Sequence, residues 1–335
     1  MMPSTKPYLR FDADGVCDAC LAAQAKKKIV EGIDWDSRLA DFENLVSWAA
    51  NQTAPFYDAL VPVRGGKDSI TQVHRLLNRG LRIVAVNVDY GLKTELGLRN
   101  LQCVPAMGAN LLVLRPELEL HKRLIRIGLE DFGDPDLMSH TLLHAYPLHI
   151  AQRFKVPLCL LGENSAFEYG GDKDLAAAQE INRNWFNSYA ANKGITAKVV
   201  SDKYNIPFSR LWQYDYPDAL DTDTSTRAVF CSAFFPWDSN EHLRIATSYG
   251  FSTLDHPSEG TYRNFVGVDE KINRLHQYLK VLKYGYGRAT DHASEDIRSG
   301  LLTREEGKQL VKKFDLQPLG NSLLSDISNF LGYEA

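Results

Sequence analysis

The stretch Val61-Pro62-Val63-Arg64-Gly65-Gly66-Lys67-Asp68-Ser69-Ile70 lies between two segments of different periodicity. The apolar run at residues 60–63 predicts a short buried strand, and the apolar spacing over 71–77 predicts a helix. The two glycines between them allow a tight turn that brings backbone N–H groups close to a ligand. Free N–H groups at a helix start attract anions, and the lysine adds a positive charge. The stretch therefore predicts a phosphate-binding loop.

The spacing of the glycines distinguishes this loop from the Walker type. A Walker loop has glycine, four further residues and then Gly-Lys-Ser/Thr, whereas Gly65 and Gly66 are adjacent. The stretch instead resembles the Ser-Gly-Gly-x-Asp-Ser loop of the PP-loop, or N-type, ATP pyrophosphatases, with Arg64 in place of the first serine. That resemblance implies cleavage of ATP between its α- and β-phosphates and transfer of AMP to a carbonyl oxygen. Arg64 removes a hydroxyl and adds a cation, so we expect rearranged pyrophosphate contacts.

A second strand follows the predicted helix after a single turn glycine. Residues 81–89 are largely apolar, so residues 60–89 form a β-α-β unit with parallel strands. Asp89 ends this strand at the edge where open α/β sheets bind ligands. The PP-loop resemblance places the adenosine at Val88 and Asp89, and the alternative is that Asp89 caps the next helix. Two motifs that agree in order and spacing favour a nucleotide site over an ordinary turn.

Strands and helices continue to alternate after this unit. Gly162 and Glu163 follow the fourth predicted strand, again at the ligand edge, where a glycine lets a nucleotide approach the backbone. Glu163 is a candidate for holding magnesium or a ribose hydroxyl, or else a solvated loop acid. The order predicts an α/β fold with a doubly wound parallel sheet, of the PP-loop ATP pyrophosphatase or adenine nucleotide alpha-hydrolase-like type. The further predicted elements are helices at 94–107, 117–132 and 139–154, and strands at 110–114 and 156–161.

The two ends of the chain differ from this core, which we assign to residues 34–165. The segment 1–33 carries Cys17 and Cys20 on a turn, which is half of a four-ligand zinc site. Two reduced cysteines that pack a small hairpin are an equal alternative, because the other cysteines are scattered singly. Residues 166–335 are assigned to a substrate- or partner-binding insertion and a mostly helical C-terminal part. Aromatic side chains in the insertion suit sugar rings as well as ordinary packing: Trp185, Tyr189, Trp212, Tyr214 and Tyr216.

The composition is that of an ordinary globular protein. The chain has 335 residues, 44% of them apolar and 24% charged, with a net charge of −4. Because the net charge is negative, the chain lacks the excess of basic residues that is expected of a protein whose main partner is nucleic acid. No apolar run approaches the ~20 residues that span a bilayer, and the N-terminus lacks the apolar core of a secretory signal. Five cysteines, an odd number, argue against a disulfide framework, so we expect a cytoplasmic protein.

Motifs near the C-terminus indicate one particular family among the PP-loop enzymes. Together with Gly15-Val16-Cys17-x-x-Cys20 and the phosphate loop, the stretches 235–241, 259–264, 284–292 and 297–306 resemble the N-acetyl sugar amidotransferase family. Members convert an acetamido group on a sugar of bacterial surface polysaccharide or flagellin into an acetamidino group. The resemblance covers almost the whole chain, and its most specific part is the spacing Lys283-x-Gly285 and Arg288-x-x-Asp291.

One departure from the family concerns the cysteines. Members usually begin with a further Cys-x-x-Cys pair shortly before a Met-Pro, whereas this sequence begins Met1-Met2-Pro3. Without that pair, Cys17 and Cys20 supply only two of the four ligands that a structural zinc ion takes.

The resemblance implies that ATP and Mg²⁺ activate an amide, which is a poor electrophile. Transfer of AMP to the amide oxygen turns that oxygen into a phosphate leaving group, and ammonia then replaces it. Fixed donors and a metal must stabilise the departing pyrophosphate. The catalytic candidates are Lys67, Asp68, Lys283 and Arg288, and the last two have plain surface charge as their alternative. The further ATP-binding candidates in the loop are Arg64, Gly65, Gly66 and Ser69.

Ammonia needs a source, because the chain shows no Cys–His arrangement of a glutaminase. The family pairs with a separate glutaminase subunit that resembles the one in histidine biosynthesis, and we expect that partner here. The expected substrate is an N-acetylated sugar or sugar nucleotide of O-antigen, lipopolysaccharide or related glycan biosynthesis. A PP-loop enzyme that modifies tRNA, such as a thiolase or lysidine-type synthetase, is the main alternative. The lack of a Lys/Arg-rich stripe argues against it. A non-catalytic nucleotide-binding subunit, disabled by Arg64, is the second alternative.

Overall fold

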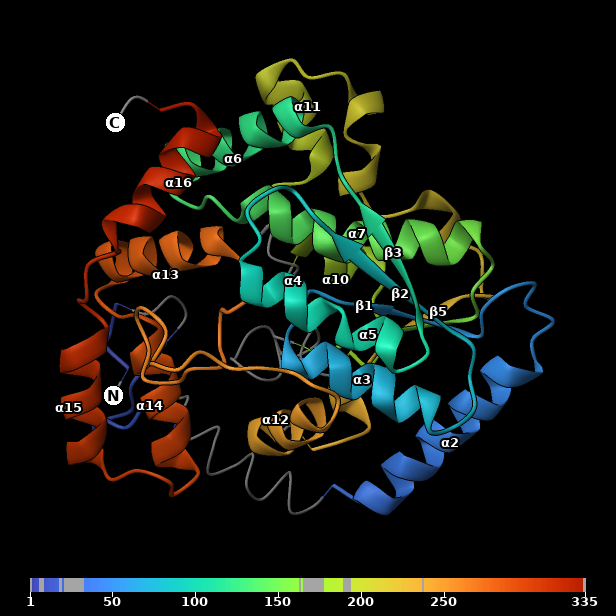
Figure 1. Ribbon diagram of the computed structural model, residues 1–335, viewed down its shortest axis with the longest axis horizontal. Coiled ribbons are helices and arrows are strands. Elements are labelled where there is room, and N and C mark those ends of the chain that lie inside the picture. Colours follow the sequence, from blue (N-terminus) through green and yellow to red (C-terminus); the bar gives the residue numbers. More distant parts are fainter. Residues whose placement is uncertain are drawn as a thin grey trace.

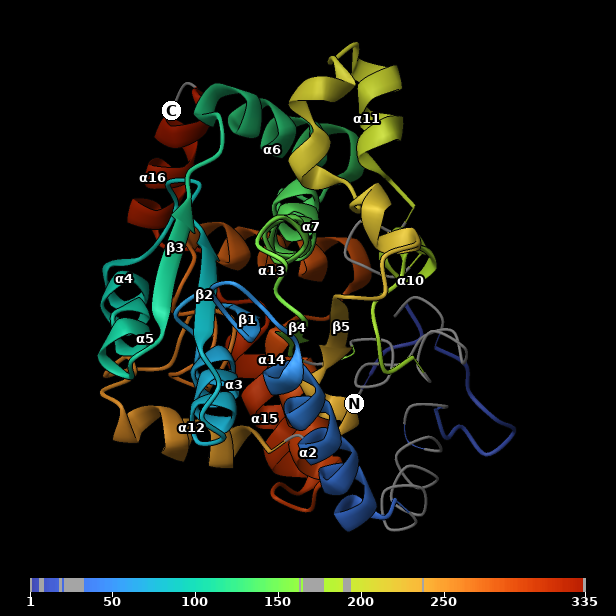
Figure 2. The same ribbon diagram turned by 90° about the vertical axis from the view of Figure 1, so that its right-hand side faces the viewer.

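A five-stranded parallel sheet forms the centre of the fold, with the strand order β3-β2-β1-β4-β5. Figure 2 shows the strands side by side in this order. The computed structural model describes residues 2–5, 9–17, 20, 33–162, 164, 178–188, 194–236 and 238–333. The order runs outward from β1 in both directions, which confirms the predicted α/β fold with a doubly wound sheet. The strands are β1 (Ala59–Pro62), β2 (Ile83–Val88), β3 (Asn110–Leu114), β4 (Leu158–Leu161) and β5 (Arg227–Phe230).

Helices cover both faces of the sheet, as Figure 1 shows. Val61 packs against α2 (Trp35–Asn51) and α3 (Lys67–Leu77) on one face, whereas its neighbour Leu60 packs against α7 (Leu137–Arg153) on the other. This alternation follows from the two-residue period of a strand. Strands covered on both faces are apolar throughout, which explains why the sequence shows continuous apolar runs here.

The remaining helices extend from these layers, and those after residue 270 form the predicted helical C-terminal region. Within the described part of the chain, none of the helices is long and apolar enough to cross a membrane. The helices are α4 (Glu95–Leu101), α5 (Cys103–Ala106), α6 (Leu118–Phe132), α10 (Arg183–Ser188), α11 (Ala197–Tyr204), α12 (Ser239–Ser248), α13 (Lys271–Tyr284), α14 (Arg288–Arg298), α15 (Arg304–Phe314) and α16 (Asn321–Leu331). Short 3₁₀ turns lie at Phe208–Arg210, Trp212–Tyr214, Asp218–Asp221 and Cys231–Ala233.

The fifth strand is absent from the sequence-based prediction. β5 pairs in parallel with β4, at the edge of the sheet opposite β3. It comes from the region after residue 166, which the sequence assigns to substrate or partner binding. A run of only four residues is too short to show a recognisable period, and that is why the pattern does not reveal it.

Three aromatic residues that the sequence favours for sugar binding belong to the core. Trp185, Tyr214 and Tyr216 are at most 5% exposed. Trp185 and Tyr216 pack in the apolar layer on the α7 side of the sheet, so their interpretation as substrate residues is wrong. Trp212 is partly exposed and packs edge-on against His149. Tyr189 lies outside the described residues.

The cysteine turn forms a small hairpin. Phe11 and Cys17 make an antiparallel bridge, and the Cys20 N–H donates to the Cys17 carbonyl at 2.8 Å. Burial and the neighbouring Cys17 raise the pKa of the Cys20 thiol. Among the residues placed by the structure, no three His, Cys, Asp or Glu side chains group as metal ligands. Two thiols do not complete a tetrahedral site, so the described residues do not fit zinc.

Candidate active site

The predicted phosphate loop joins β1 to α3 at the carboxyl edge of the sheet. The sequence predicts a helix from residue 71, but α3 begins at Lys67, so Lys67, Asp68 and Ser69 form its first turn. Gly66 is the N-cap and brings no side chain to cap the helix, which leaves the first N–H groups of α3 available to an anion. A Cβ on Gly66 would meet no atom within 4 Å, so open space adjoins these groups. The loop fits a phosphate.

Gly65 holds the loop against two distant segments. Its φ is +95°, and a Cβ there would lie 2.5 Å from the Gly97 carbonyl oxygen on α4. A Cβ on Gly97 would lie 2.6 Å from the Cα of Asp269. Three backbone segments therefore stack at contact distance: the phosphate loop, α4 and the segment that precedes α13.

Arg64 connects the same segments through its charge. Its Nε donates to Asp269 Oδ2 at 2.9 Å. Burial disfavours the carboxylate, but the Arg64 charge outweighs this effect and lowers the pKa of Asp269. The sequence places Arg64 among the phosphate contacts, whereas the structure pairs it with a carboxylate of the C-terminal region.

Asp68 lies between two donors. Its Oδ1 accepts from Lys67 Nζ and from His242 Nδ1, each at 2.7 Å. Burial raises the pKa of Asp68, but Lys67 and the His242 bond outweigh it and bring the value to about 2. Asp68 is therefore ionised at neutral pH and holds the Lys67 ammonium beside the loop.

His242 is a site residue that the sequence does not reveal. It lies on α12, is 1% exposed, and its carbonyl accepts from Thr71 Oγ1 at 3.3 Å, so α12 packs along α3. The histidine is 174 residues from Asp68. No motif spacing covers such a separation, and only the packing of α12 on α3 brings the two side chains together.

The end of β2 lies beside the loop. Val88 is the last residue of β2 and is buried. Asp89 Oδ1 accepts from the Gly91 N–H at 3.0 Å, and its Oδ2 from Arg115 Nε at 3.3 Å. Asp89 therefore closes a turn and does not cap α4, whose N-cap is Thr94. The helix-capping alternative for Asp89 is wrong.

The end of β4 is described only in part. The Gly162 carbonyl accepts from the Ser232 N–H at 3.3 Å, which ties this turn to the residues after β5. Glu163 lies outside the described residues. The prediction that this turn meets the nucleotide stays a prediction.

The two C-terminal catalytic candidates point to different places. Lys283 Nζ donates to the Phe132 carbonyl at 2.9 Å, at the C-terminal end of α6. Arg288 reaches toward Gly267, where its Nη1 lies 2.8 Å from the position of an added Cβ. Because Gly267 is close in sequence to Asp269, the structure brings Arg288 near the segment that contacts the loop.

His292 lies among charged side chains of the C-terminal region. Its Nδ1 lies 2.7 Å from Thr261 Oγ1. Burial lowers the pKa of His292 well below its usual value, and four positive charges lower it further, so the ring is neutral. These charges belong to Arg263, Arg288, Lys280 and Lys67. Three of them are offset by carboxylates, because Arg263 pairs with Asp296, Lys280 with Asp291 and Lys67 with Asp68.

A buried polar cluster, which we call the acid cluster, adjoins Arg64 and Asp269. It consists of Tyr90, Asp136 and Glu270, each at most 1% exposed. Contacts through neighbouring residues link the three side chains: Asn273, on the first turn of α13 after Glu270, lies 3.5 Å from Asp136 Oδ2. Tyr90 stacks on His121, whose Nε2 lies 3.1 Å from Ser139 Oγ on the first turn of α7 after Asp136. After the larger effect of burial, the charges of both carboxylates raise the pKa of Tyr90. The sequence does not reveal this cluster, because its members lie in separate segments with no common motif.

Lys93 pairs with the acid cluster from a neighbouring strand-like segment. Lys93 and Glu270 form an isolated antiparallel bridge, and Lys93 Nζ donates to Glu270 Oε1 at 2.7 Å. Burial raises the pKa of Glu270 to about 7, against the opposing charges of Lys93 and Arg64. Glu270 is thus a buried carboxyl group that titrates near neutral pH, a property typical of catalytic acids and bases.

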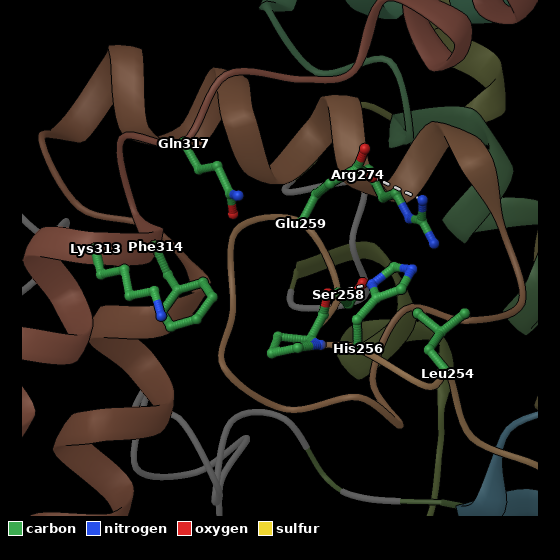
Figure 3. Close-up of a pocket in the computed structure, with 9 residues that line it drawn as sticks. Leu254, His256, Ser258, Glu259, Arg274, Lys313, Phe314 and Gln317 are labelled. Atoms are coloured by element: carbon green, nitrogen blue, oxygen red, sulfur yellow. Dashed lines mark hydrogen bonds and ion pairs between the residues drawn. The ribbon is translucent and has the colours of Figure 1, made fainter.

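A cavity of about 390 Å³ lies on the C-terminal side (Figure 3). Lys313 and Phe314 line it from α15, and Arg274 lines it from α13. Arg274 Nη1 donates to Glu259 Oε2 at 2.7 Å, while its buried Nε has no partner among the described residues. Arg274 lies one helical turn after Glu270, so the cavity and the acid cluster share the start of α13.

Comparison with known proteins gives one family match. Residues 259–335 match the family model described as "LPS biosynthesis protein WbpG-like, C-terminal domain". This range contains α13 to α16, the Asp269 partner of the loop, and most of the cavity lining. No curated protein matches the chain.

Solved structures align with the chain at low identity. NMN synthetase from Francisella tularensis has 10% identity and a TM-score of 0.36, covering 90% of this chain and 94% of its own. The NH3-dependent NAD synthetase from Campylobacter jejuni in complex with the nitrate ion has 11% identity and a TM-score of 0.32, with the same coverage. NAD+ synthetase from Burkholderia pseudomallei has 14% identity and a TM-score of 0.29, covering 71% of this chain and 96% of its own.

Proposed function

We propose that the protein is an ATP-dependent amidotransferase that converts the acetamido group of an N-acetylated sugar into an acetamidino group, releasing AMP and pyrophosphate. The observation that supports this most is the loop at the start of α3, where the helix lacks a side-chain cap and Asp68 holds Lys67 at 2.7 Å. The match of residues 259–335 to an LPS biosynthesis domain supports a glycan substrate.

The α3 end of the site holds the phosphates of ATP. The N–H groups of its first turn and the Lys67 ammonium stabilise the charge that develops on pyrophosphate as it leaves. Bound Mg²⁺ supplies further positive charge at this point, and Asp68 is the loop carboxylate that would hold it. Arg288 adds positive charge from the C-terminal side.

The chemistry takes two steps. The amide oxygen attacks the α-phosphorus, an O–P bond forms, and the bond to the bridging oxygen of pyrophosphate breaks. Ammonia then adds to the activated carbon, a C–N bond forms, and the C–O bond breaks with its electron pair leaving on AMP. The first step removes the difficulty of expelling oxide from an amide.

We place the sugar in the cavity of Figure 3. Its volume of about 390 Å³ is that of a small-molecule site. Arg274, Glu259 and Lys313 offer charged donors and acceptors to hydroxyl and acidic groups, and Phe314 offers an apolar surface to a ring. From there the acetamido group would extend along the first turn of α13 toward the acid cluster. Ammonia would come from a separate glutaminase subunit.

The test is the release of pyrophosphate and AMP from ATP with magnesium and ammonium chloride, across a panel of diacetamido sugars and their nucleotide conjugates. We expect release that depends on one sugar and is lost in Lys67→Ala. The matched control is Lys122→Ala, an α6 lysine that pairs with Glu119 and should keep wild-type release. Release without any sugar dependence, or equal release from Lys67→Ala, would contradict the proposal. Release that depends on tRNA would favour a tRNA-modifying enzyme instead.

A further inference from the structure

Three buried oxygen atoms in the acid cluster have no hydrogen-bond partner among the described residues. They are Tyr90 Oη, Asp136 Oδ1 and Glu270 Oε2. Buried polar groups in folded proteins are nearly always paired, because an unpaired group has lost its water and gained nothing in return. Asn273 joins Asp136 to the first turn of α13 beside Glu270, and His121 joins Tyr90 to the first turn of α7 beside Asp136, so the three residues lie in one contact network. Three unpaired acceptor atoms in one such network point to a ligand that donates hydrogen bonds.

Each carboxylate in the cluster has one oxygen anchored and one oxygen unpaired. Glu270 Oε1 accepts from Lys93 Nζ at 2.7 Å, whereas Oε2 has no partner among the described residues. Asp136 Oδ2 lies 3.1 Å from His140 Nε2 and 3.5 Å from Asn273 Nδ2, whereas Oδ1 has no partner among the described residues. The anchoring bonds fix the carboxylates, so the unpaired oxygens are positioned acceptors rather than loose side chains.

Stacking of its ring on a histidine holds Tyr90 in place. The ring stacks on His121 with centroids 4.9 Å apart and planes at 29°. His121 is in turn held by Tyr214 Oη at 2.8 Å and Ser139 Oγ at 3.1 Å. The phenol oxygen of Tyr90 therefore has a fixed position, although no described residue bonds to it.

We propose that Tyr90, Asp136 and Glu270 bind one ammonium ion, the protonated form of the nitrogen substrate. This inference rests on the proposed amidotransferase function and assigns its second substrate to a specific set of side chains.

The charge balance favours a cation. Arg64 and Lys93 supply two positive charges against the three carboxylates of Asp136, Asp269 and Glu270, which leaves one negative charge in excess when Glu270 is ionised. His140 does not compensate, because burial lowers its pKa to about 4 and it is neutral at neutral pH. One monovalent cation restores neutrality.

The number of donors favours ammonium in particular. Ammonium carries four N–H donors, enough for all three unpaired oxygens, whereas water has two donors and no charge. A magnesium ion needs near-octahedral coordination and retains several water molecules, whereas the three side chains are cut off from solvent.

Glu270 also accounts for the proton that ammonium must lose before it can attack. The proton moves from ammonium to Glu270 Oε2, so that an N–H bond breaks and an O–H bond forms. The freed lone pair makes the C–N bond to the activated carbon as the C–O bond to AMP breaks. A carboxyl group that titrates near the working pH is suited to this transfer.

The direct test is a thermal-unfolding titration of the full chain with ammonium chloride, against sodium and potassium chloride at constant ionic strength. We expect a saturable rise in melting temperature with ammonium, and a smaller one with potassium, which cannot donate hydrogen bonds. In Tyr90→Phe and Glu270→Gln, the ammonium concentration for half-saturation should rise at least tenfold. Tyr90→Phe deletes only an unpaired hydroxyl, so it remains informative if Glu270→Gln fails to fold.

The matched control is Tyr216→Phe, which removes the hydroxyl of a buried tyrosine in the apolar layer on the α7 side of the sheet and should leave the ammonium response unchanged. Equal responses to ammonium and potassium would overturn the assignment to ammonium. An ammonium response that is absent from the wild type, or unchanged in Tyr90→Phe, would overturn the site itself.

An activity assay separates this proposal from the proposed function. Exchange of pyrophosphate into ATP reports the first step, which uses no ammonia, and Tyr90→Phe should keep it while its KM for ammonium rises at least tenfold. If no sugar supports exchange but ammonium still stabilises the wild type and not Tyr90→Phe, the ammonium site stands and the proposed function fails. If exchange depends on a sugar but the KM for ammonium is unchanged in Tyr90→Phe, the proposed function stands and the site fails.

Discussion

Arg64 Nε lies 2.9 Å from Asp269 Oδ2, and this ion pair joins the phosphate loop to the segment that leads into α13. The two residues are 205 positions apart in the chain. Beside the pair, the backbones of Gly65, Gly97 and Asp269 are stacked at contact distance. The loop that carries the expected ATP chemistry is therefore positioned by the same C-terminal region that matches an LPS biosynthesis domain.

Loss of the Arg64 side chain should destabilise the protein by leaving Asp269 buried and unpaired. We expect Arg64→Ser to lower the free energy of unfolding by about 2–3 kcal/mol, because Arg64 is partly exposed and a fully buried pair costs about 3–5 when broken. The double variant Arg64→Ser/Asp269→Asn should recover part of this loss. Urea unfolding of the two single variants and the double variant measures the coupling energy, and additive losses would contradict the pairing.

The two loop glycines should respond differently to alanine. Gly65→Ala places a methyl group 2.5 Å from the Gly97 oxygen at a φ of +95°, so it should lower the free energy of unfolding by about 2 kcal/mol or more. Gly66→Ala meets no atom within 4 Å and should keep the stability. It should instead weaken ATP binding at least tenfold, because the methyl group enters the phosphate space. Urea unfolding and ATP titration check both, and normal ATP binding by Gly66→Ala would contradict the placement of the phosphate.

Asp68 should make stability depend on acidic pH. Its pKa is lowered from 3.8 to about 2 in the folded protein, so between these values the unfolded chain binds more protons than the folded one. The contribution of Asp68 is therefore present above pH ~4 and is lost as the pH falls through ~2. Asp68→Asn should show a shallower fall of the unfolding free energy over this window. A slope equal to that of the wild type would contradict the Lys67–Asp68–His242 arrangement.

Trp185 should matter for stability. Trp185→Ala empties a core position that is 1% exposed and should lower the free energy of unfolding by about 3–5 kcal/mol. Trp212→Ala, at a position 37% exposed, should cost about 1 kcal/mol. Chemical denaturation of both variants tests the assignment of Trp185 to the core, and similar losses would argue against it.

Neighbouring lysines on α15 test the placement of the sugar. Lys313 lines the cavity, so Lys313→Ala should raise the KM for the sugar about tenfold while the KM for ATP stays the same. Lys312→Ala changes the adjacent exposed residue of the same helix and is the matched control. Equal effects of the two substitutions on the sugar KM would show that the cavity is not the sugar site.

The local part of the site could be predicted because it is contiguous in sequence. The β-α-β unit depends on apolar runs, a tight turn and a helix start, all of which occupy neighbouring residues between 60 and 89. β3 has the predicted bounds for the same reason. The prediction fails where the signal is short or ambiguous: β5 has four residues, and aromatic residues such as Trp185 fit a core as well as a sugar.

By itself, the sequence determined the α/β class, the position of the phosphate loop and the helical C-terminal region, because strand and helix periods and glycine conformations act over a few residues. The tertiary structure decided which charged side chains lie next to each other. Asp68 contacts His242, which lies 174 positions away in the chain, and Arg64 contacts Asp269, which lies 205 positions away. Only the structure gathers Tyr90, Asp136 and Glu270 and buries them. Electrostatic energy and burial depend on distances in space, and separation along the chain carries no information about such distances once the chain has folded back on itself.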